Sequence, residues 1–500
     1  MHHALHIPEI LLEILQLFSW RSTLETVEKR TLFNSALVCR QFQRMSLDQL
    51  WKHMDDLTPL FRLLSHFKMP QDESKMGEIC GPISESECVK FGAYARRIRS
   101  YAKRRSERIA LSAYIHVLQA TNQLCLLPEL KTLRVSTRTS EDEILLLISP
   151  SLQKAYFRDG HSRKSHVDAS VHSLQMTARS LTCLDIWASF TAASLRSIGS
   201  MRRLKKLNIT HWDTANPCGL DLDFLLDLAS SDTLENLDIY GFQLNSSRPK
   251  PLHQVITFPA LTLCKWTGLA SVGVFLDFIQ NVNLPKLVEI DLKFEGSNQR
   301  DRSDWASFFH TLPTFASHLR SIELGFAPTS RSSPWESPEL PFHNFECLSS
   351  CDLTSLVIVI PIFSEFSSDQ IIAILSCWRN LKTLTFRPRL QALPFQVLVW
   401  IGQTLSKLRY LSLDIDASVL PAVDSVPILD HSLVQLSLCG DLGEPWDLAR
   451  LIDRIFPRLD DIECMAQDSE DTQDYCYKMR QLLEVCISVR SDERKRCQAA

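Results

Sequence analysis

The chain has 500 residues, 45% of them hydrophobic and 22% charged, and a formal net charge of −4. This length is sufficient for a large core and for more than one domain. A protein built around nucleic acid would carry a strongly basic balance, so we expect no nucleic-acid partner. Only 14 glycines are present, which argues against wide glycine-rich loops that cradle phosphates.

The 15 cysteines are odd in number and scattered; Cys347 and Cys351 lie close, but no second pair has metal-ligand spacing. We interpret them as free thiols in a reducing compartment and expect no metal site. The apolar run at the N-terminus contains Glu9 and Glu13 and lacks a basic leader, so no secretory signal is expected. Internal apolar runs are shorter than the ~20 residues that span a bilayer. We therefore expect no membrane association and a cytoplasmic location, a nuclear one, or both.

Residues 1–60 predict a small module of three short helices. The first is apolar nearly all round between Ile10 and Phe18, the second begins near Leu32, and the third follows Met45. So small a domain buries only ~60% of its chain's surface. A surplus apolar face should therefore be covered, either by another protein or by the repeats that follow in the chain.

Three stretches of this module are Ile7-Pro8-Glu9-Ile10-Leu11-Leu12-Glu13-Ile14, Leu37-Val38-Cys39-Arg40-Gln41-Phe42 and Leu50-Trp51. Together they resemble an F-box of the fungal, basidiomycete-like type. The resemblance implies a three-helix module that docks on a Skp-type adaptor and, through it, on the cullin of a ubiquitin ligase. In that family a leucine-rich-repeat domain often follows and selects the protein to be ubiquitylated.

The resemblance also implies which residues contact the adaptor. Four of them, Leu37, Val38, Cys39 and Phe42, would continue the interface from the second helix. Ile7 stands where leucine is more usual, Phe42 where tryptophan is common, and the link at 19–31 is long; none of these departures removes an apolar contact. The full implied adaptor-binding set is Ile7, Pro8, Ile10, Leu11, Ile14, Leu37, Val38, Cys39, Phe42 and Trp51.

Residues 61–128 are expected to form a linker and an N-terminal cap for the repeats. Residues 70–86 have the composition of a loop, and a basic run follows from Tyr94 to Arg105. We interpret this run as a solvated helix face beside an irregular first repeat. A nucleic-acid or nuclear-import role for it stays open as the alternative.

From 129 to 466 the chain repeats one pattern: an apolar residue, two variable residues, an apolar one, a variable one and a third apolar one. Its first positions recur every 22 to 34 residues, about 27 on average, which is typical of leucine-rich repeats. The thirteen copies begin at Leu130, Leu152, Leu181, Leu204, Leu234, Leu261, Leu287, Leu319, Leu353, Leu381, Leu408, Leu433 and Leu459.

Short amphipathic stretches with helical spacing follow most copies, for example at 224–228 and 371–375. We therefore expect an α/β fold: a leucine-rich-repeat solenoid whose curved parallel sheet carries helices on its convex side. Residues 467–500 would supply a C-terminal capping helix and a tail. The alternative is an ordinary α/β sheet whose strands happen to begin with leucine.

Side chains between the apolar positions should point to the concave face. In the third to eighth copies this row reads Asp185, Asn208, Asp238, Lys265, Asp291 and Glu323, an acidic row beside exposed aromatic residues. Tryptophan and tyrosine are frequent anchors of protein interfaces. Alternatively, these aromatic side chains cover neighbouring strands or loops. The predicted client-binding residues are Asp185, Trp187, Trp212, Asp238 and Tyr240.

The sequence contains no phosphate-binding loop, paired-histidine zinc helix or G-x-S-x-G nucleophile elbow. We therefore expect no enzymatic activity, no catalytic residues and no cofactor. The leading hypothesis is a substrate-recognition subunit of a ubiquitin ligase that binds a Skp-type adaptor and an unknown protein client. The alternative is a leucine-rich-repeat scaffold with no ligase role.

Overall fold

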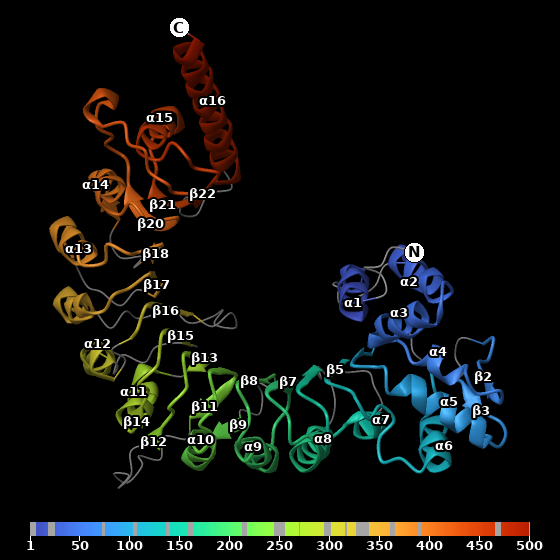
Figure 1. Ribbon diagram of the computed structural model, residues 1–500. Helices are drawn as coiled ribbons and strands as arrows, with labels where there is room; N and C mark the ends of the chain where they lie inside the picture. The colour runs from blue at the N-terminus through green and yellow to red at the C-terminus, as the bar shows by residue number, and fades with distance from the viewer. Residues whose placement is uncertain are drawn as a thin grey trace. The chain divides into compact units, whose positions relative to one another are not determined.

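The described part of the chain divides into two compact units, Met1–Phe242 and Gln243–Ala500 (Figure 1). The structure is a computed structural model. It describes residues 7–18, 26–72, 76–103, 108–136, 141–158, 164–212, 218–244, 256–269, 271–294, 302–315, 318–326, 340–360, 366–387, 392–465 and 472–499.

The first unit opens with three helices: α1 (Pro8–Leu17), α2 (Thr26–Ala36) and α3 (Arg40–Lys52). Proline begins α1, where its missing amide hydrogen costs nothing and its fixed φ suits a helix. Three leucines are buried between the helices because leucine side chains are most stable away from water. The core consists of Leu11, Leu15 and Leu32, with Phe18, Phe42, Met45 and Leu50 packed around it.

The second helix ends earlier than the sequence suggested. Its last turn is closed by bonds from Leu37 N to Asn34 O at 3.1 Å and from Val38 N to Ser35 O at 3.2 Å. Such bonds to the third preceding residue tighten and end a helix. The placement of Leu37, Val38, Cys39 and Phe42 on the second helix is therefore wrong: the first three connect α2 to α3, and Phe42 belongs to α3.

Three helices between residues 58 and 121 pack around an aromatic core. The rings of Phe91 and Tyr114 lie 5.7 Å and 5.1 Å from the ring of Phe61, both edge-on. The basic run is not one solvated helix face, since the helix ends at Ala95 and a strand follows. The elements are α4 (Thr58–Phe61), β2 (Phe67–Lys68), β3 (Glu78–Ile79), α5 (Glu85–Ala95), β4 (Ser100–Ala102) and α6 (Leu111–Thr121).

Parallel strands in chain order form the sheet of the first unit, and two of them, β1 and β4, precede the repeated pattern. The second apolar position of each motif pairs with the same position in the next motif, as Leu184 does with Leu207. The strands are β1 (His53–Met54), β4, β5 (Thr132–Ser136), β6 (Lys154–Arg158), β7 (Cys183–Ala188), β8 (Lys206–His211) and β10 (Asn236–Tyr240).

Helices connect these strands and lie side by side along one face of the sheet (Figure 1). Apolar motif residues such as Leu184 and Ile186 are buried, while residues that alternate with them reach the other face. The connecting helices are α7 (Glu141–Leu147), α8 (Lys164–Thr177), α9 (Ala192–Gly199) and α10 (Leu222–Ala229), and two short strands, β9 (Cys218–Leu220) and β11 (Phe242–Leu244), lie nearby in sequence.

The second unit repeats this arrangement. Its parallel strands again follow chain order, and Ile290, Ile322 and Leu356 pair in register from one motif to the next. The strands are β13 (Leu263–Leu269), β15 (Glu289–Phe294), β16 (Ser321–Phe326), β17 (Ser355–Ile358), β18 (Thr383–Phe386), β20 (Tyr410–Asp416), β21 (Gln435–Asp441) and β22 (Asp461–Met465).

Helices again alternate with strands, and a long C-terminal helix packs against α15 and β22. The helices are α11 (Val272–Gln280), α12 (Arg302–Phe315), η3 (Phe342–Ser350), α13 (Ser368–Leu375), α14 (Gln396–Thr404), η4 (Val423–Ser425), α15 (Pro445–Ile455) and α16 (Thr472–Ala499); the remaining short strands are β12 (Ile256–Thr257), β14 (Val282–Asn283) and β19 (Leu393–Pro394).

Each of the thirteen predicted motif copies coincides with a strand of one of these two units. The chain is thus an α/β protein with a long parallel sheet flanked by helices. Stacked strand–helix units in chain order are compatible with a solenoid-like fold. Among the described residues, no helix is both long and apolar enough to cross a bilayer.

Candidate functional site

One face of α1 is apolar and open to solvent. Ile7, Ile10, Ile14 and Leu17 are exposed, and their spacing of three or four residues puts them on one side of the helix. Leu11 lies on an adjacent side of the helix and is 1% exposed, within the three-helix core. The apolar residues of this helix are therefore divided between an internal core and an external surface.

The connection between α2 and α3 adds to the exposed apolar surface. Leu37 and Val38 are 70% and 56% exposed, and the neighbouring Cys39 is also exposed in an extended conformation. Pro8, at the start of α1, is exposed as well. We name this set the N-terminal apolar surface: Ile7, Pro8, Ile10, Ile14, Leu37, Val38 and Cys39.

Three other residues of the predicted adaptor-binding set have packing roles. Leu11 offers no surface, and Phe42 packs against the leucine core. The ring of Trp51 lies 4.8 Å from that of Tyr94 on α5. Trp51 thus helps to hold α3 against the helix that follows it in the same unit.

The predicted client-binding residues lie on the exposed face of β7, β8 and β10. Asp185 and Asp238 both pair in register with Asn208 of β8, and Trp187 and Tyr240 both pair with Thr210. Because adjacent strands are ~4.8 Å apart, the α-carbon of Asp185 is roughly 10 Å from that of Asp238, and the same holds for Trp187 and Tyr240. The structure therefore brings four of the five residues onto one face.

Exposure differs among these residues. Trp187 is 46% exposed, whereas Asp185, Asp238 and Tyr240 are half-buried. Trp212 is also half-buried and follows the last residue of β8. Trp187 is therefore the aromatic side chain of this group best placed to contact a partner.

The two strands that precede β7, namely β5 and β6, carry basic and aromatic residues on the same face as Trp187. Arg134 lies over the ring of Tyr156, with 4.6 Å from the guanidinium carbon to the ring centre. Tyr156 pairs in register with Asp185, and Arg158 with Trp187. Burial raises the pKa of Asp185, and the positive charges of Arg158 and Arg134 oppose that shift. The surroundings of Asp185 are therefore basic.

The acidic row expected from the sequence is not an acidic surface in the second unit. Asp291 is buried, and its carboxylate lies 2.7 Å from Lys265 Nζ and 3.4 Å from Lys293 Nζ. Lys293 also forms an ion pair with Glu323. Lys265 comes from the neighbouring strand β13 and Lys293 from the same strand as Asp291, and together they neutralise the row. A carboxylate this deep is stable only with such partners.

Arg134, Tyr156 and Arg158 were not among the predicted site residues. They occupy the same variable positions in the first two motif copies that Asp185 and Trp187 occupy in the third. The signal is present in the sequence, because the row could have been followed back through the first two copies. What the sequence lacks is the contact between Arg134 and Tyr156, which arises from strand register.

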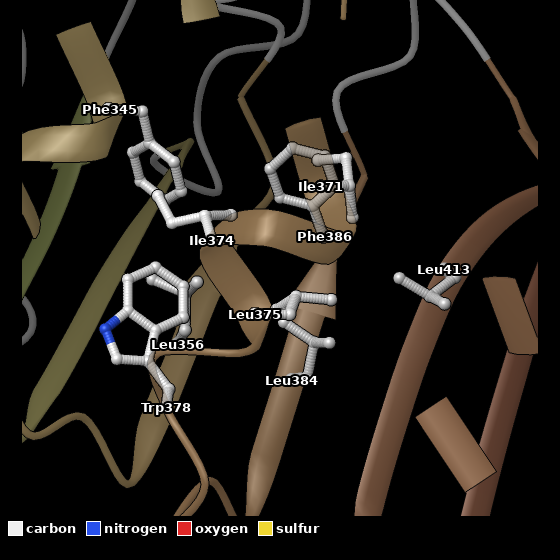
Figure 2. A pocket seen from close by; sticks show the side chains of 9 residues that line it. All are labelled: Phe345, Leu356, Ile371, Ile374, Leu375, Trp378, Leu384, Phe386 and Leu413. Atoms are coloured by element: carbon white, nitrogen blue, oxygen red, sulfur yellow. The ribbon is translucent and has the colours of Figure 1, made fainter. Parts of the chain in front are cut away.

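A small gap lies within the core of the second unit (Figure 2). Its accessible space of about 10 Å³ has room for about one water molecule, but the lining offers no polar surface to hold one. The lining consists of Phe345, Leu356, Ile371, Ile374, Leu375, Trp378, Leu384, Phe386 and Leu413, and the indole nitrogen of Trp378 donates to Leu348 O instead. We interpret the gap as a packing defect.

One cysteine and histidine pair lies on the helices of the second unit. Cys347 Sγ is 2.8 Å from His310 Nδ1. Burial raises the pKa of the Cys347 thiol, which works against a reactive thiolate at neutral pH. Among the described residues, no group of three or more His, Cys, Asp and Glu side chains could hold a metal ion.

Comparisons with known proteins add little to this geometry. No protein-family model and no curated protein matches the chain. Among solved structures, the chain is similar to a protein from Bacteroides fragilis determined by a structural genomics consortium. The match has 13% identity and a TM-score of 0.29, and it covers 55% of this chain and 75% of that one. A likeness this weak carries no argument about fold or function.

Proposed function

We propose that this chain is a substrate-recognition subunit of a Skp-cullin-F-box type ubiquitin ligase. In this proposal α1 to α3 are an F-box that docks a Skp-type adaptor, and the strand–helix repeats are leucine-rich repeats that bind a protein client. The chain itself would carry no catalytic residue; it would bring the client to the catalytic subunits, and proximity would be its contribution. It would act in the cytoplasm or the nucleus.

The observation that carries the proposal is the N-terminal apolar surface. Its isoleucine, leucine and valine side chains lie open to solvent beside a leucine core that is already filled. So many exposed apolar side chains on one small helical module are typical of an interface with another protein. Its position on the stretches that resemble an F-box selects a Skp-type adaptor as the partner.

The repeats support the second half of the proposal. Their variable positions form an exposed sheet face on which Trp187 and Tyr240 lie near Asp185 and Asp238. Large aromatic side chains of this kind supply much of the binding energy at protein interfaces.

The first prediction concerns adaptor binding by the intact chain. The variant Ile14→Asp/Leu37→Asp places charges on the N-terminal apolar surface without touching Leu11 and the core. We expect the wild-type chain to bind a purified Skp-type adaptor in an interferometry assay. The double variant should bind at least about 30-fold more weakly, the equivalent of about 2 kcal/mol.

Val27→Asp serves as the matched control, since Val27 is an exposed apolar residue outside the predicted set. It should bind the adaptor as wild type does, and all three proteins should unfold at similar temperatures. Failure of the wild type to bind, or equal binding by the double variant, would contradict the ligase role. A repeat scaffold without a ligase role would then be the better description.

A further inference from the structure

The exposed face of strands β5 to β8 carries more basic side chains than acidic ones. Its basic side chains lie at alternate positions of three strands, on the side away from the connecting helices. All four are exposed. We name them the β5–β8 basic patch: Arg134, Lys154, Arg158 and Lys206.

The four cations of the patch lack a close carboxylate partner in the part of the chain that the structure describes, although Arg134 also contacts the ring of Tyr156. Among the described residues, no carboxylate lies within ion-pair distance of any member of the patch. The sheet face of the second unit differs, because Lys265 and Lys293 are paired with Asp291. Within the described residues, the lysines around Asp291 are thus neutralised, whereas the cations of the β5–β8 basic patch have no close ion pair.

One carboxylate lies within the patch. Asp185 is half-buried, and it interacts electrostatically with Arg158 and Arg134. It is too deep to serve as the main contact for a partner, and its charge favours positions of both guanidinium groups near the sheet. Asp185 is therefore suited to orient the arginines.

Trp187 supplies an apolar contact beside these cations. It pairs in register with Arg158 on one side and with Thr210 on the other. Its indole is 46% exposed although the flanking Ile186 and Ala188 are fully buried. An exposed indole next to unpaired cations would be covered by a ligand that is acidic and also carries an apolar group.

We propose that the β5–β8 basic patch and Trp187 bind an acidic segment of a polypeptide in an extended conformation. Carboxylates of the segment pair with the patch, and an apolar side chain packs against Trp187. The inference deepens the proposed function, and it rests on it for identifying this segment as part of the client.

Spacing favours a polypeptide over a nucleic acid. Neighbouring strands are ~4.8 Å apart, so the α-carbons of Lys154 and Lys206, which are in register two strands apart, are roughly 10 Å apart. Arg134 is one strand and two residues from Lys154 and from Arg158, roughly 8 Å. Alternate side chains of an extended peptide are ~6.6 Å apart, a spacing that long lysine and arginine side chains reach from these positions. Four cations around Asp185, in a chain with a net charge of −4, are a poor match for the closely spaced phosphates of a nucleic acid.

The second prediction tests this inference with a labelled peptide. The probe is a fluorescein-labelled 13-residue peptide of alternating Glu and Ala with a central Phe, and binding to the full chain is measured by anisotropy. We expect binding that weakens when salt is raised, since exposed charges are screened. A peptide with Gln in place of Glu should bind at least tenfold more weakly, as should the acidic peptide to Arg134→Glu/Arg158→Glu.

Arg202→Glu/Arg203→Glu is the matched control, because both arginines are exposed in the same unit but precede β8. This variant should bind the acidic peptide within about twofold of wild type. Trp187→Ala should weaken binding of the Phe-containing peptide more than it weakens binding of a peptide with Ala at the centre. Thermal unfolding of each variant distinguishes lost contact from lost structure.

Three results would overturn the inference. The first is a wild type that binds no acidic peptide, the second is an equal loss of peptide affinity in the patch variant and the control variant, and the third is a wild type that binds a single-stranded oligothymidylate more tightly than the acidic peptide. Adaptor binding is measured on the same variants and should not change. A wild-type chain that binds the adaptor but not the acidic peptide would reject the inference alone. Peptide binding without adaptor binding would reject the ligase role and leave the inference standing.

Discussion

The imidazole of His431 is buried in the second unit, and both of its nitrogens have backbone partners. Nε2 donates to Leu405 O at 2.8 Å, and Leu433 N donates to Nδ1 at 3.1 Å. This arrangement fits only the neutral ring, because Nδ1 must accept a hydrogen bond. Burial lowers the pKa of His431, and the bond to Leu405 O opposes the shift only in part.

The third prediction follows from this lowered pKa. Below the ordinary histidine value of roughly 6.5, the unfolded chain binds a proton on this ring more readily than the folded chain. The contribution of His431 to the free energy of unfolding should therefore be constant above that value and fall as the pH drops toward the lowered pKa. Scanning calorimetry from about pH 8 to about pH 5 should show a falling unfolding temperature.

His431→Gln separates this group from the others that titrate. It should lower the free energy of unfolding by about 1–3 kcal/mol at pH 8, because a buried backbone group loses its partner. Its unfolding temperature should then fall less steeply with acid than that of wild type. His343→Gln changes an exposed histidine and should run parallel to wild type. If the unfolding temperature of His431→Gln also falls with acid as steeply as that of wild type, the buried ring does not determine the pH dependence.

At the scale of elements, a single side chain joins two neighbouring helices of the first unit. Thr191 caps the start of α9 by accepting from Ala193 N at 3.2 Å and Ser194 N at 3.3 Å. The same hydroxyl donates to Asp168 of α8, with 2.8 Å to both carboxylate oxygens. Consecutive repeats are therefore joined on the helix side as well as through the sheet.

The fourth prediction is that Thr191→Ala lowers the free energy of unfolding by about 1–2 kcal/mol, the usual effect of losing an N-cap hydroxyl. Chemical denaturation followed by circular dichroism measures it. Thr191→Ser keeps the hydroxyl and should retain most of the stability. If the serine and alanine variants lose equal stability, the methyl group matters and the cap does not.

Elements of this fold differ in how well the sequence predicts them. The strands were predictable because each motif alternates buried and exposed residues, and a strand lies at every copy. The end of α2 was not, because the apolar run through Leu37 and Val38 continues past it. The neutral row around Asp291 was also missed, since Lys265 reaches it from the preceding repeat and Lys293 from two residues along the same strand, and the first of these pairings depends on register.

At the scale of the whole molecule, contacts follow chain order. Each strand of the main sheet within a unit pairs with the strands of the preceding and following motifs, as β7 does with β6 and β8. Stability in such an array is close to a sum of repeat terms and nearest-neighbour terms. A local defect should therefore loosen its surroundings before it affects distant repeats.

The fifth prediction applies this to two core leucines that are nearly inaccessible, Leu207 in the first unit and Leu411 in the second. Either leucine replaced by alanine should cost about 2–5 kcal/mol. Hydrogen exchange measured by mass spectrometry should accelerate chiefly in the strands of the altered unit. Each variant is the control for the other, and equal acceleration throughout both units would mean that the array unfolds as a single block.

The alternation of buried and exposed residues along each strand has a consequence for how such a protein diversifies. Ile186 and Leu184 maintain the interior, while Asp185 and Trp187 alternate with them on the outside. A substitution at an outer position can alter what the surface attracts while leaving the interior packing unchanged. Preference for a partner can therefore drift one repeat at a time, and related chains can share a scaffold while binding quite different molecules.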